Sequence, residues 1–178
     1  MNLPNKLTVL RMALIPFFVM FLLADLGTAG KYIALAVFII ASLTDTLDGY
    51  LARKNHQVTN FGKFMDPLAD KLLVCSALIC LVDKQILESW IVIVIIAREF
   101  IISGFRLIAS DNGIVIAASV WGKAKTISQM IMIVLLILDW GGAFNVLERI
   151  FVWAALILTI VSLVDYIVKN KDILNMQN

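Results

Sequence analysis

Four aspartates, Asp45, Asp48, Asp66 and Asp70, are unusual because they fall near the ends of long apolar segments. Asp45 and Asp48 are three residues apart and Asp66 and Asp70 are four apart, so each pair shares one face of a helix. An ionised group inside a membrane-spanning segment is costly and usually has a function. A short polar connection at 54–61 makes the two segments antiparallel neighbours, so both pairs can meet at one depth.

This group of carboxylates predicts a site for divalent metal ions. Four neighbouring carboxylates cannot all stay ionised without a countercharge. Oxygen ligands suit Mg²⁺ or Mn²⁺, particularly where substrate phosphates complete the coordination, and no cysteine or histidine cluster accompanies them to favour Zn²⁺. Two ions held by shared carboxylates could clamp a phosphoryl group. The alternative is a set of surface ion pairs with the nearby cations Arg53, Lys63 and Lys71.

The elements that must position these aspartates are long apolar segments. The chain has 178 residues, is 61% hydrophobic and has a mean hydropathy of +0.94, which exceeds the values of soluble domains. A membrane-spanning helix needs about 20 mostly apolar residues. Six segments meet this requirement: 7–25, 31–52, 64–82, 87–108, 117–138 and 146–168. We therefore expect an all-α polytopic membrane protein, with six transmembrane helices in a single domain over residues 1–178 and a cytosol-facing polar cavity.

Positive charge is divided unequally between the two sides of the expected membrane protein. Six spans place both termini on one side, and that side receives 12 of the 15 lysines and arginines, against 3 on the other. An excess of lysine and arginine marks the cytoplasmic side. The termini and the four aspartates are therefore expected at the cytosolic face of the cell (inner, cytoplasmic) membrane. The net charge of only +2 gives no reason to expect a nucleic-acid partner.

The aspartates also belong to a longer pattern. The run Asp45-Thr-Leu-Asp48-Gly49-Tyr-Leu-Ala52-Arg53 is followed after eight residues by Gly62, and then by Asp66 and Asp70. This resembles the complete signature of the CDP-alcohol phosphatidyltransferase family, with all eight defining positions matched. Members of this family transfer a phosphatidyl group, or a related phosphoalcohol, from a CDP-linked donor to an acceptor hydroxyl and release CMP. Six spans is also the architecture of the family.

The resemblance implies a role for each position of the signature. Asp45, Asp48 and Asp66 would be ligands of two divalent metal ions, and Asp70 would join the metal site and act as the general base. A carboxylate within hydrogen-bond reach can take the proton that an acceptor hydroxyl loses. The nucleotide would contact Asp48, Gly49, Ala52, Arg53 and Gly62. Small side chains at positions 49 and 52 would let a nucleotide approach the helix, although close helix packing explains them equally well.

The acceptor has to be inferred from residues outside the signature. Segments 97–106 and 122–126, with the opening 2–11, resemble the bacterial branch of the family that makes phosphatidylglycerophosphate from CDP-diacylglycerol and sn-glycerol 3-phosphate. The phosphate dianion of this acceptor needs fixed cations. Four candidates lie at the ends of two spans: Arg98, Arg106, Lys123 and Lys125. Which of them contacts the phosphate stays open, and one arginine could hold the donor or pair with Glu99 instead.

Helical geometry limits how these four cations act together. Arg98 and Arg106 are eight residues apart, which is about 12 Å along a helix axis, so they are not expected to hold one phosphate from the same side. Lys123 and Lys125 would point to different faces of a helix. The simpler alternative is ordinary positive-inside charge with side chains that reach the membrane surface.

Other interpretations stay open from the sequence. Asn5 and Thr8 could contact the donor headgroup or cap the first helix. The acceptor could instead be serine, inositol phosphate or a phospholipid. An ion-coupled transporter is a further alternative, but it would place its charges near the bilayer midplane and break helices in two repeats, whereas these acids lie near one surface and no repeat is found. The family resemblance also implies a homodimer.

Overall fold

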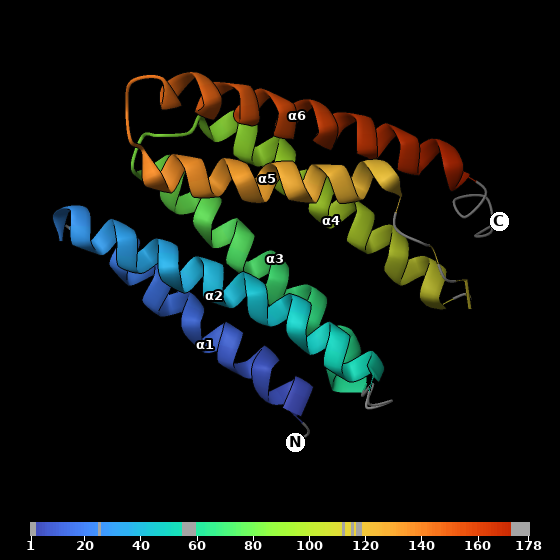
Figure 1. The fold of residues 1–178 in the computed structure, drawn as a ribbon. Helices are drawn as coiled ribbons and strands as arrows, with labels where there is room; N and C mark the ends of the chain where they lie inside the picture. The colour runs from blue at the N-terminus through green and yellow to red at the C-terminus, as the bar shows by residue number, and fades with distance from the viewer. Residues whose placement is uncertain are drawn as a thin grey trace. The chain divides into compact units, whose positions relative to one another are not determined.

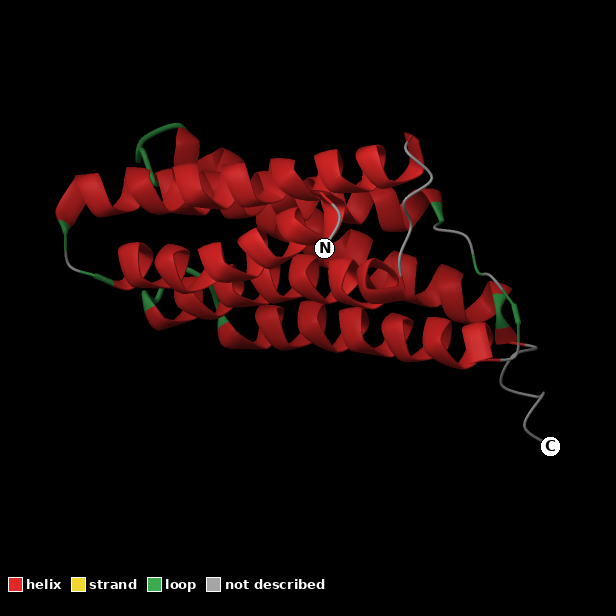
Figure 2. Ribbon diagram, turned by 90° about the horizontal axis from the view of Figure 1, so that it is seen from below, coloured by secondary structure: helices red, strands yellow, loops and turns green. Residues whose placement is uncertain are grey.

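The computed structural model of the chain describes residues 3–24, 26–54, 60–111, 113–114, 116 and 119–171. These residues form six helices, labelled in Figure 1. The helices are α1 (Leu3–Leu23), α2 (Gly27–Lys54), α3 (Asn60–Asp83), α4 (Ser89–Asp111), α5 (Val120–Leu138) and α6 (Phe144–Lys169). No strand occurs in this part of the chain (Figure 2). The prediction of an all-α fold with six helices is confirmed.

Several helices extend beyond the apolar segments that predicted them. The first begins at Leu3 rather than near residue 7, and the third begins at Asn60 rather than near residue 64. Backbone hydrogen bonds continue a helix whether or not its side chains are apolar, so hydropathy finds only the apolar middle of each helix. The helix α2 ends at Lys54, which leaves only the short polar connection predicted between the two signature halves.

Four of the described helices are long and apolar enough to cross a membrane. The qualifying segments are Asn5–Leu23, Gly27–Thr44, Val120–Leu138 and Phe144–Lys169. The other two, α3 and α4, have 24 and 23 residues and are long enough, but both carry several charged residues along their length. The apolar character agrees with a membrane protein. That all six helices span the membrane stays a prediction.

The chain divides into two compact units, residues 1–86 and 87–178. In the first unit, α1 packs against both α2 and α3. The fully buried rings of Phe18 and Phe38 join α1 to α2, with their centroids 5.6 Å apart.

Gly30 allows a close turn between α1 and α2. A Cβ atom at this position would lie 3.0 Å from the carbonyl oxygen of Phe21 and 2.9 Å from Cβ of Leu26.

In the second unit, α6 packs against α4 and α5. Buried apolar side chains from all three helices form its core, including Ile95 on α4, Met132 and Ile133 on α5, and Leu156 on α6. The helix α5 is capped by Ser119, whose hydroxyl oxygen accepts a hydrogen bond of 3.1 Å from the backbone N–H of Gly122. A side-chain cap of this kind satisfies one of the free N–H groups at the start of a helix.

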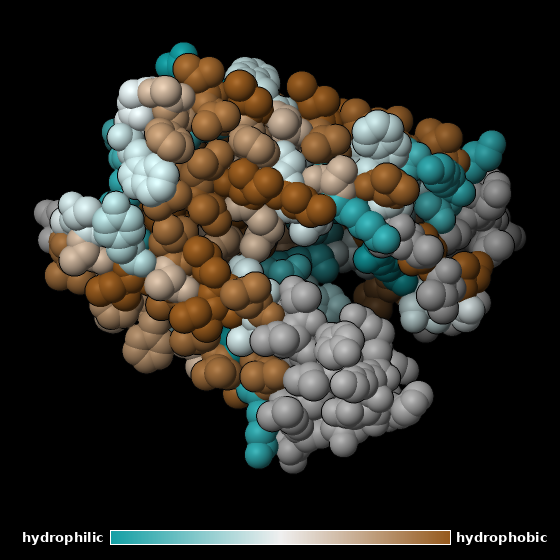
Figure 3. Space-filling view, in the orientation of Figure 1, coloured by the Kyte–Doolittle hydropathy of each residue, from teal (hydrophilic) through white to brown (hydrophobic). Residues whose placement is uncertain are grey.

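Large apolar side chains lie on the surface of both units. Hydrophobic residues, drawn in brown, cover much of the face that Figure 3 shows. Ile93 on α4 and Val120 on α5 are 65% and 79% exposed. Apolar patches of this extent are rare on soluble monomers and mark surfaces that face lipid or another partner.

Candidate active site

The two aspartate pairs lie on α2 and α3, at equal distances from the connection between these helices. Asp48 lies six residues before Lys54, and Asp66 lies six residues after Asn60. The two helices contact each other and run in opposite directions (Figure 1). The pairs therefore occupy matching levels of an antiparallel helix pair, as predicted. The side chains of Asp45 and Asp48 lie outside the described residues, whereas those of Asp66 and Asp70 are both partly buried on one face of α3.

The carboxylate of Asp66 is held by α1. The hydroxyl of Thr8 donates a hydrogen bond of 2.5 Å to Oδ1 of Asp66, across 58 residues of sequence. Thr8 is fully buried. It lies within α1 and so does not cap that helix, which was one of its two expected roles. Among the described residues, Asp66 forms no second hydrogen bond, so Oδ2 keeps its lone pairs for a ligand.

A second contact from α1 lies close to the other aspartate pair. Arg11 is fully buried, and its Nε donates a hydrogen bond of 3.2 Å to the backbone carbonyl of Ala41 on α2. Ala41 is one helical turn before Asp45. Because charged side chains are almost never fully buried without a partner, Arg11 acts here as part of the polar interior. It is not only a cytosolic charge, as its place in the positive-inside pattern suggested.

Lys71 does not support the alternative in which the aspartates form simple surface ion pairs with nearby cations. Its ammonium donates to the backbone carbonyl of Pro67 at 3.3 Å, and within the described part of the chain it pairs with no carboxylate. The other two cations of that alternative, Arg53 and Lys63, have side chains outside the described residues. Lys71 therefore does not neutralise Asp66 or Asp70.

The predicted nucleotide contacts are only partly described. Gly62 is buried in the first turns of α3. The predicted contacts Gly49, Ala52 and Arg53 lie on α2, and their surroundings fall outside the described residues, as does the side chain of Asp48. Their role in nucleotide binding stays a prediction.

The donor set of the aspartates suits a hard divalent cation. Carboxylate oxygens are the ligands that Mg²⁺ and Mn²⁺ prefer, and Asp66 has an oxygen available. No three His, Cys, Asp or Glu residues come together among the described side chains, to which Asp45 and Asp48 do not belong. The residues fit the predicted metal in type, and the metal itself stays a prediction.

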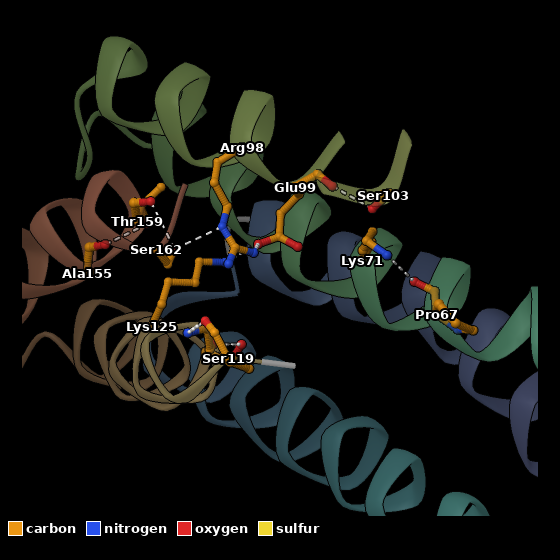
Figure 4. Close-up of polar contacts among 12 residues, drawn as sticks. Pro67, Lys71, Arg98, Glu99, Ser103, Ser119, Lys125, Ala155, Thr159 and Ser162 are labelled. Carbon is orange, nitrogen blue, oxygen red and sulfur yellow. Dashed lines mark hydrogen bonds and ion pairs between the residues drawn. The ribbon is translucent and has the colours of Figure 1, made fainter. Parts of the chain in front are cut away.

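The predicted acceptor cations lie in the second unit, where Arg98 belongs to a buried polar cluster (Figure 4). Its Nε donates a hydrogen bond of 3.0 Å to Oγ of Ser162 on α6, and its Nη1 lies 3.1 Å from Oε1 of Glu99. The ammonium of Lys125 on α5 forms an ion pair with the same oxygen of Glu99. The expected alternative of a pair between an arginine and Glu99 is therefore present in the structure.

The other cations differ sharply in burial. Lys123 is exposed, whereas Lys125 is only 3% exposed, which confirms that these two lysines point to different faces of α5. Arg106 is exposed and lies over the ring of Tyr166, 6.0 Å from its centroid. Arg98 and Arg106 therefore contact different residues of α6, as their separation predicted. A lysine that reached the membrane surface would be exposed, so the snorkelling alternative suits Lys123 and not Lys125.

Two polar residues of the cluster around Arg98 were not predicted, Thr159 and Ser162 on α6, and in the first unit the bond from Thr8 to Asp66 was not predicted either. Thr159 and Ser162 are fully buried and three residues apart, so they share one face of α6. The sequence does contain a signal for them, namely two hydroxyl side chains three residues apart within an otherwise apolar segment.

Most of this chain is similar in sequence to known proteins of one family. The family model for CDP-alcohol phosphatidyltransferases matches residues 1–161. The chain is 45% identical to the CDP-diacylglycerol–glycerol-3-phosphate 3-phosphatidyltransferase of Bacillus subtilis, with 99% of each chain covered. It is 41% identical to the Haemophilus influenzae protein of the same name, over 93% of this chain and 91% of the relative. A probable phosphatidylglycerophosphate synthase of Mycobacterium tuberculosis is 39% identical, over 94% of this chain and 81% of the relative.

Proposed function

This chain belongs to the CDP-alcohol phosphatidyltransferase family, and we propose that it transfers the phosphatidyl group of CDP-diacylglycerol to sn-glycerol 3-phosphate. The products are phosphatidylglycerophosphate and CMP, so the reaction is a step of phospholipid synthesis. The observation that carries this proposal is the similarity to relatives named for this reaction, which extends over 99% of the chain in the case of Bacillus subtilis. The complete aspartate signature between Asp45 and Asp70 supports the phosphatidyl transfer, whereas the choice of acceptor rests on the relatives.

The reaction requires one P–O bond to form and another to break. A hydroxyl oxygen of glycerol 3-phosphate attacks the phosphorus that carries the diacylglycerol, and the bond from that phosphorus to the oxygen bridging to CMP breaks. The hydroxyl proton goes to the carboxylate of Asp70, which acts as the general base. CMP leaves with the bridging oxygen. Asp70 takes this role because it occupies the last position of the signature and its side chain is partly buried on α3.

Asp45, Asp48, Asp66 and Asp70 would hold two divalent ions, Mg²⁺ or Mn²⁺. When bound, such ions neutralise charge on a diphosphate and on a leaving phosphate. The hydrogen bond from Thr8 fixes the orientation of Asp66, and the free oxygen of that carboxylate supports a role as ligand. Gly49, Ala52, Arg53 and Gly62, with Asp48, would contact the nucleotide.

The acceptor phosphate would bind to the cations of the second unit. Arg98 and Lys125 are the strongest candidates, because both are buried and converge on Glu99. Arg106 and Lys123 are exposed and would assist from the surface. Arginine offers planar bidentate contacts to phosphate, and lysine offers a compact charge.

The membrane arrangement is part of the proposal. We propose six transmembrane helices in one domain, a polar cavity that faces the cytosol, and a location in the cytoplasmic membrane. The support is the distribution of 12 cations against 3, together with four helices that are apolar enough to span. A homodimer is proposed on the family resemblance alone.

A panel of acceptors tests the reaction. Purified protein in detergent would be given CDP-diacylglycerol, Mg²⁺ and one acceptor at a time, and release of CMP would be measured. Glycerol 3-phosphate is expected to support release, whereas serine, inositol phosphate and a phospholipid are expected to give only background. Turnover with serine or inositol phosphate, and none with glycerol 3-phosphate, would show that the acceptor is wrong while the family chemistry stands.

A further inference from the structure

The buried cluster on α4, α5 and α6 contains two cations and one anion that meet at a single atom. Nη1 of Arg98 lies 3.1 Å from Oε1 of Glu99, and Nζ of Lys125 contacts the same oxygen. Arg98 is 8% exposed and Lys125 is 3% exposed. Two like charges do not approach one point in a buried environment unless an opposite charge lies between them. Glu99 therefore supplies the attraction that brings the two cations together.

Ser162 fixes the direction of the Arg98 side chain. Its hydroxyl donates a hydrogen bond of 3.0 Å to the backbone carbonyl of Thr159, so its oxygen is left to accept 3.0 Å from Nε of Arg98. A hydroxyl has one proton, and Ser162 already donates it to the carbonyl of Thr159 on α6. The hydroxyl is thus oriented as an acceptor, and the guanidinium is held at two of its three nitrogens, Nε by Ser162 and Nη1 by Glu99.

The third nitrogen of Arg98 is left for a ligand. Among the residues that the structure describes, Nη2 has no hydrogen-bond acceptor. It lies beside Gly122, where an added Cβ atom would contact it at 3.5 Å. Nη2 is not one of the fully buried polar atoms that lack a partner, so it is accessible to an anion or water.

We infer that Glu99 is a positioning residue, which holds Arg98 beside Lys125 so that Nη2 of Arg98 can bind the acceptor phosphate, and that Ser162 sets the angle of Arg98. This rests on the proposed function, because it assigns the phosphate of glycerol 3-phosphate to these cations. Glu99 itself does not touch the substrate. Without the charge of Glu99, Nη1 of Arg98 loses its ion pair, and the acceptor phosphate loses a preformed site.

Steady-state kinetics of Glu99→Gln separates this role from a general structural one. The substitution keeps the shape of the side chain and removes its charge. The KM for glycerol 3-phosphate is expected to rise by about 10-fold or more, the size of a lost charge-assisted contact. The KM for CDP-diacylglycerol should stay within about twofold of wild type. The matched control is Glu88→Gln, which changes an exposed glutamate of the same unit and should alter neither KM.

Ser162→Ala keeps the inference testable if Glu99→Gln does not yield folded protein. It removes only the hydroxyl oxygen that accepts from Nε of Arg98, and it should raise the KM for glycerol 3-phosphate by about 3- to 10-fold. The control is Ser103→Ala, since the hydroxyl of Ser103 bonds only to the carbonyl of Glu99 in its own helix. Size-exclusion elution in detergent confirms that each variant is folded.

Three results would overturn the inference. The first is an unchanged KM for glycerol 3-phosphate in folded Glu99→Gln and in Ser162→Ala. The second is an equal rise of the KM values for both substrates, which is the pattern of a merely structural role. The third is a lower KM for glycerol 3-phosphate in Glu99→Gln, which would mean that Glu99 competes with the phosphate. If wild-type protein does not use glycerol 3-phosphate at all, the proposed function is wrong, and this inference is wrong with it.

Discussion

The hydroxyl of Thr8 on α1 donates a hydrogen bond of 2.5 Å to Oδ1 of Asp66 on α3. This bond joins a residue outside the aspartate signature to one inside it. The hydroxyl is fully buried, so water does not replace the bond when it is lost. Hydrogen bonds to a charged group in such a setting contribute about 1.5–3 kcal/mol. The orientation of Asp66 therefore depends on α1 as well as on α3.

Thr8→Val should weaken catalysis through Asp66. Valine has nearly the shape of threonine and lacks the hydroxyl, so Asp66 would lose its orientation without a large cavity. The Mg²⁺ concentration for half-maximal CMP release is expected to rise by about 10-fold, from the energy of a charged hydrogen bond. Thr28→Val, at an exposed position near the start of α2, is the control and should leave the requirement unchanged. An unchanged Mg²⁺ requirement in Thr8→Val would mean that the bond has no part in metal binding.

Asp70→Asn should abolish turnover while binding of CDP-diacylglycerol stays measurable. The amide cannot accept the proton of the acceptor hydroxyl, and a general base contributes about 10²- to 10⁴-fold to the rate. CMP release measures turnover, and equilibrium binding of the donor measures the site. Asp83→Asn changes an exposed aspartate at the other end of the same helix and should keep normal activity. Near-normal turnover in Asp70→Asn would refute its assignment as the base.

Removal of divalent metal should stop the reaction. Four aspartates on two neighbouring helices need countercharge, and the proposed reaction places further negative charge among them. Excess EDTA is expected to reduce CMP release to background, and Mg²⁺ or Mn²⁺ added beyond the chelator should restore it. Full activity in excess EDTA would contradict the proposed metal site.

Arg98→Ala should raise the KM for glycerol 3-phosphate more than the KM for CDP-diacylglycerol. A buried guanidinium that binds a phosphate contributes about 1.5–3 kcal/mol, which corresponds to a rise of roughly 10- to 100-fold. Lys123→Ala, which removes an exposed cation two residues from Lys125, should change the acceptor KM by much less. Equal effects of the two variants would argue that bulk positive charge, rather than the buried cluster, attracts the acceptor.

Gly30→Ala should destabilise the first unit. The added Cβ atom would meet the backbone carbonyl of Phe21 at 3.0 Å, and backbone cannot move aside as a flexible side chain can. Overpacking of this kind costs about 1–3 kcal/mol, which outweighs the gain of up to about 1 kcal/mol from replacing a helical glycine. Thermal unfolding in detergent should therefore begin at a lower temperature. Gly104→Ala, where nothing lies within 4 Å of the added atom, should not lower it.

Much of the fold was predictable because its signals are local. Apolar runs located all six helices, and the antiparallel pairing of α2 and α3 followed from the short connection after Lys54. The helix ends were less predictable, since a helix continues through polar residues such as those between Asn60 and residue 64. The opposite faces of Lys123 and Lys125 followed from helical geometry alone, and their difference in burial confirms it.

The sequence by itself determined the aspartate spacing from Asp45 to Asp70, and with it the family and the chemistry proposed for it. Only the tertiary structure decided which distant residues complete the two sites. Thr8 reaches Asp66 across 58 residues, and Ser162 reaches Arg98 across 64. The physical reason is that helical period fixes which residues of one helix share a face, whereas the partner on another helix depends on how the helices pack. Burial then made Lys125, and not its neighbour Lys123, a member of the polar cluster around Glu99.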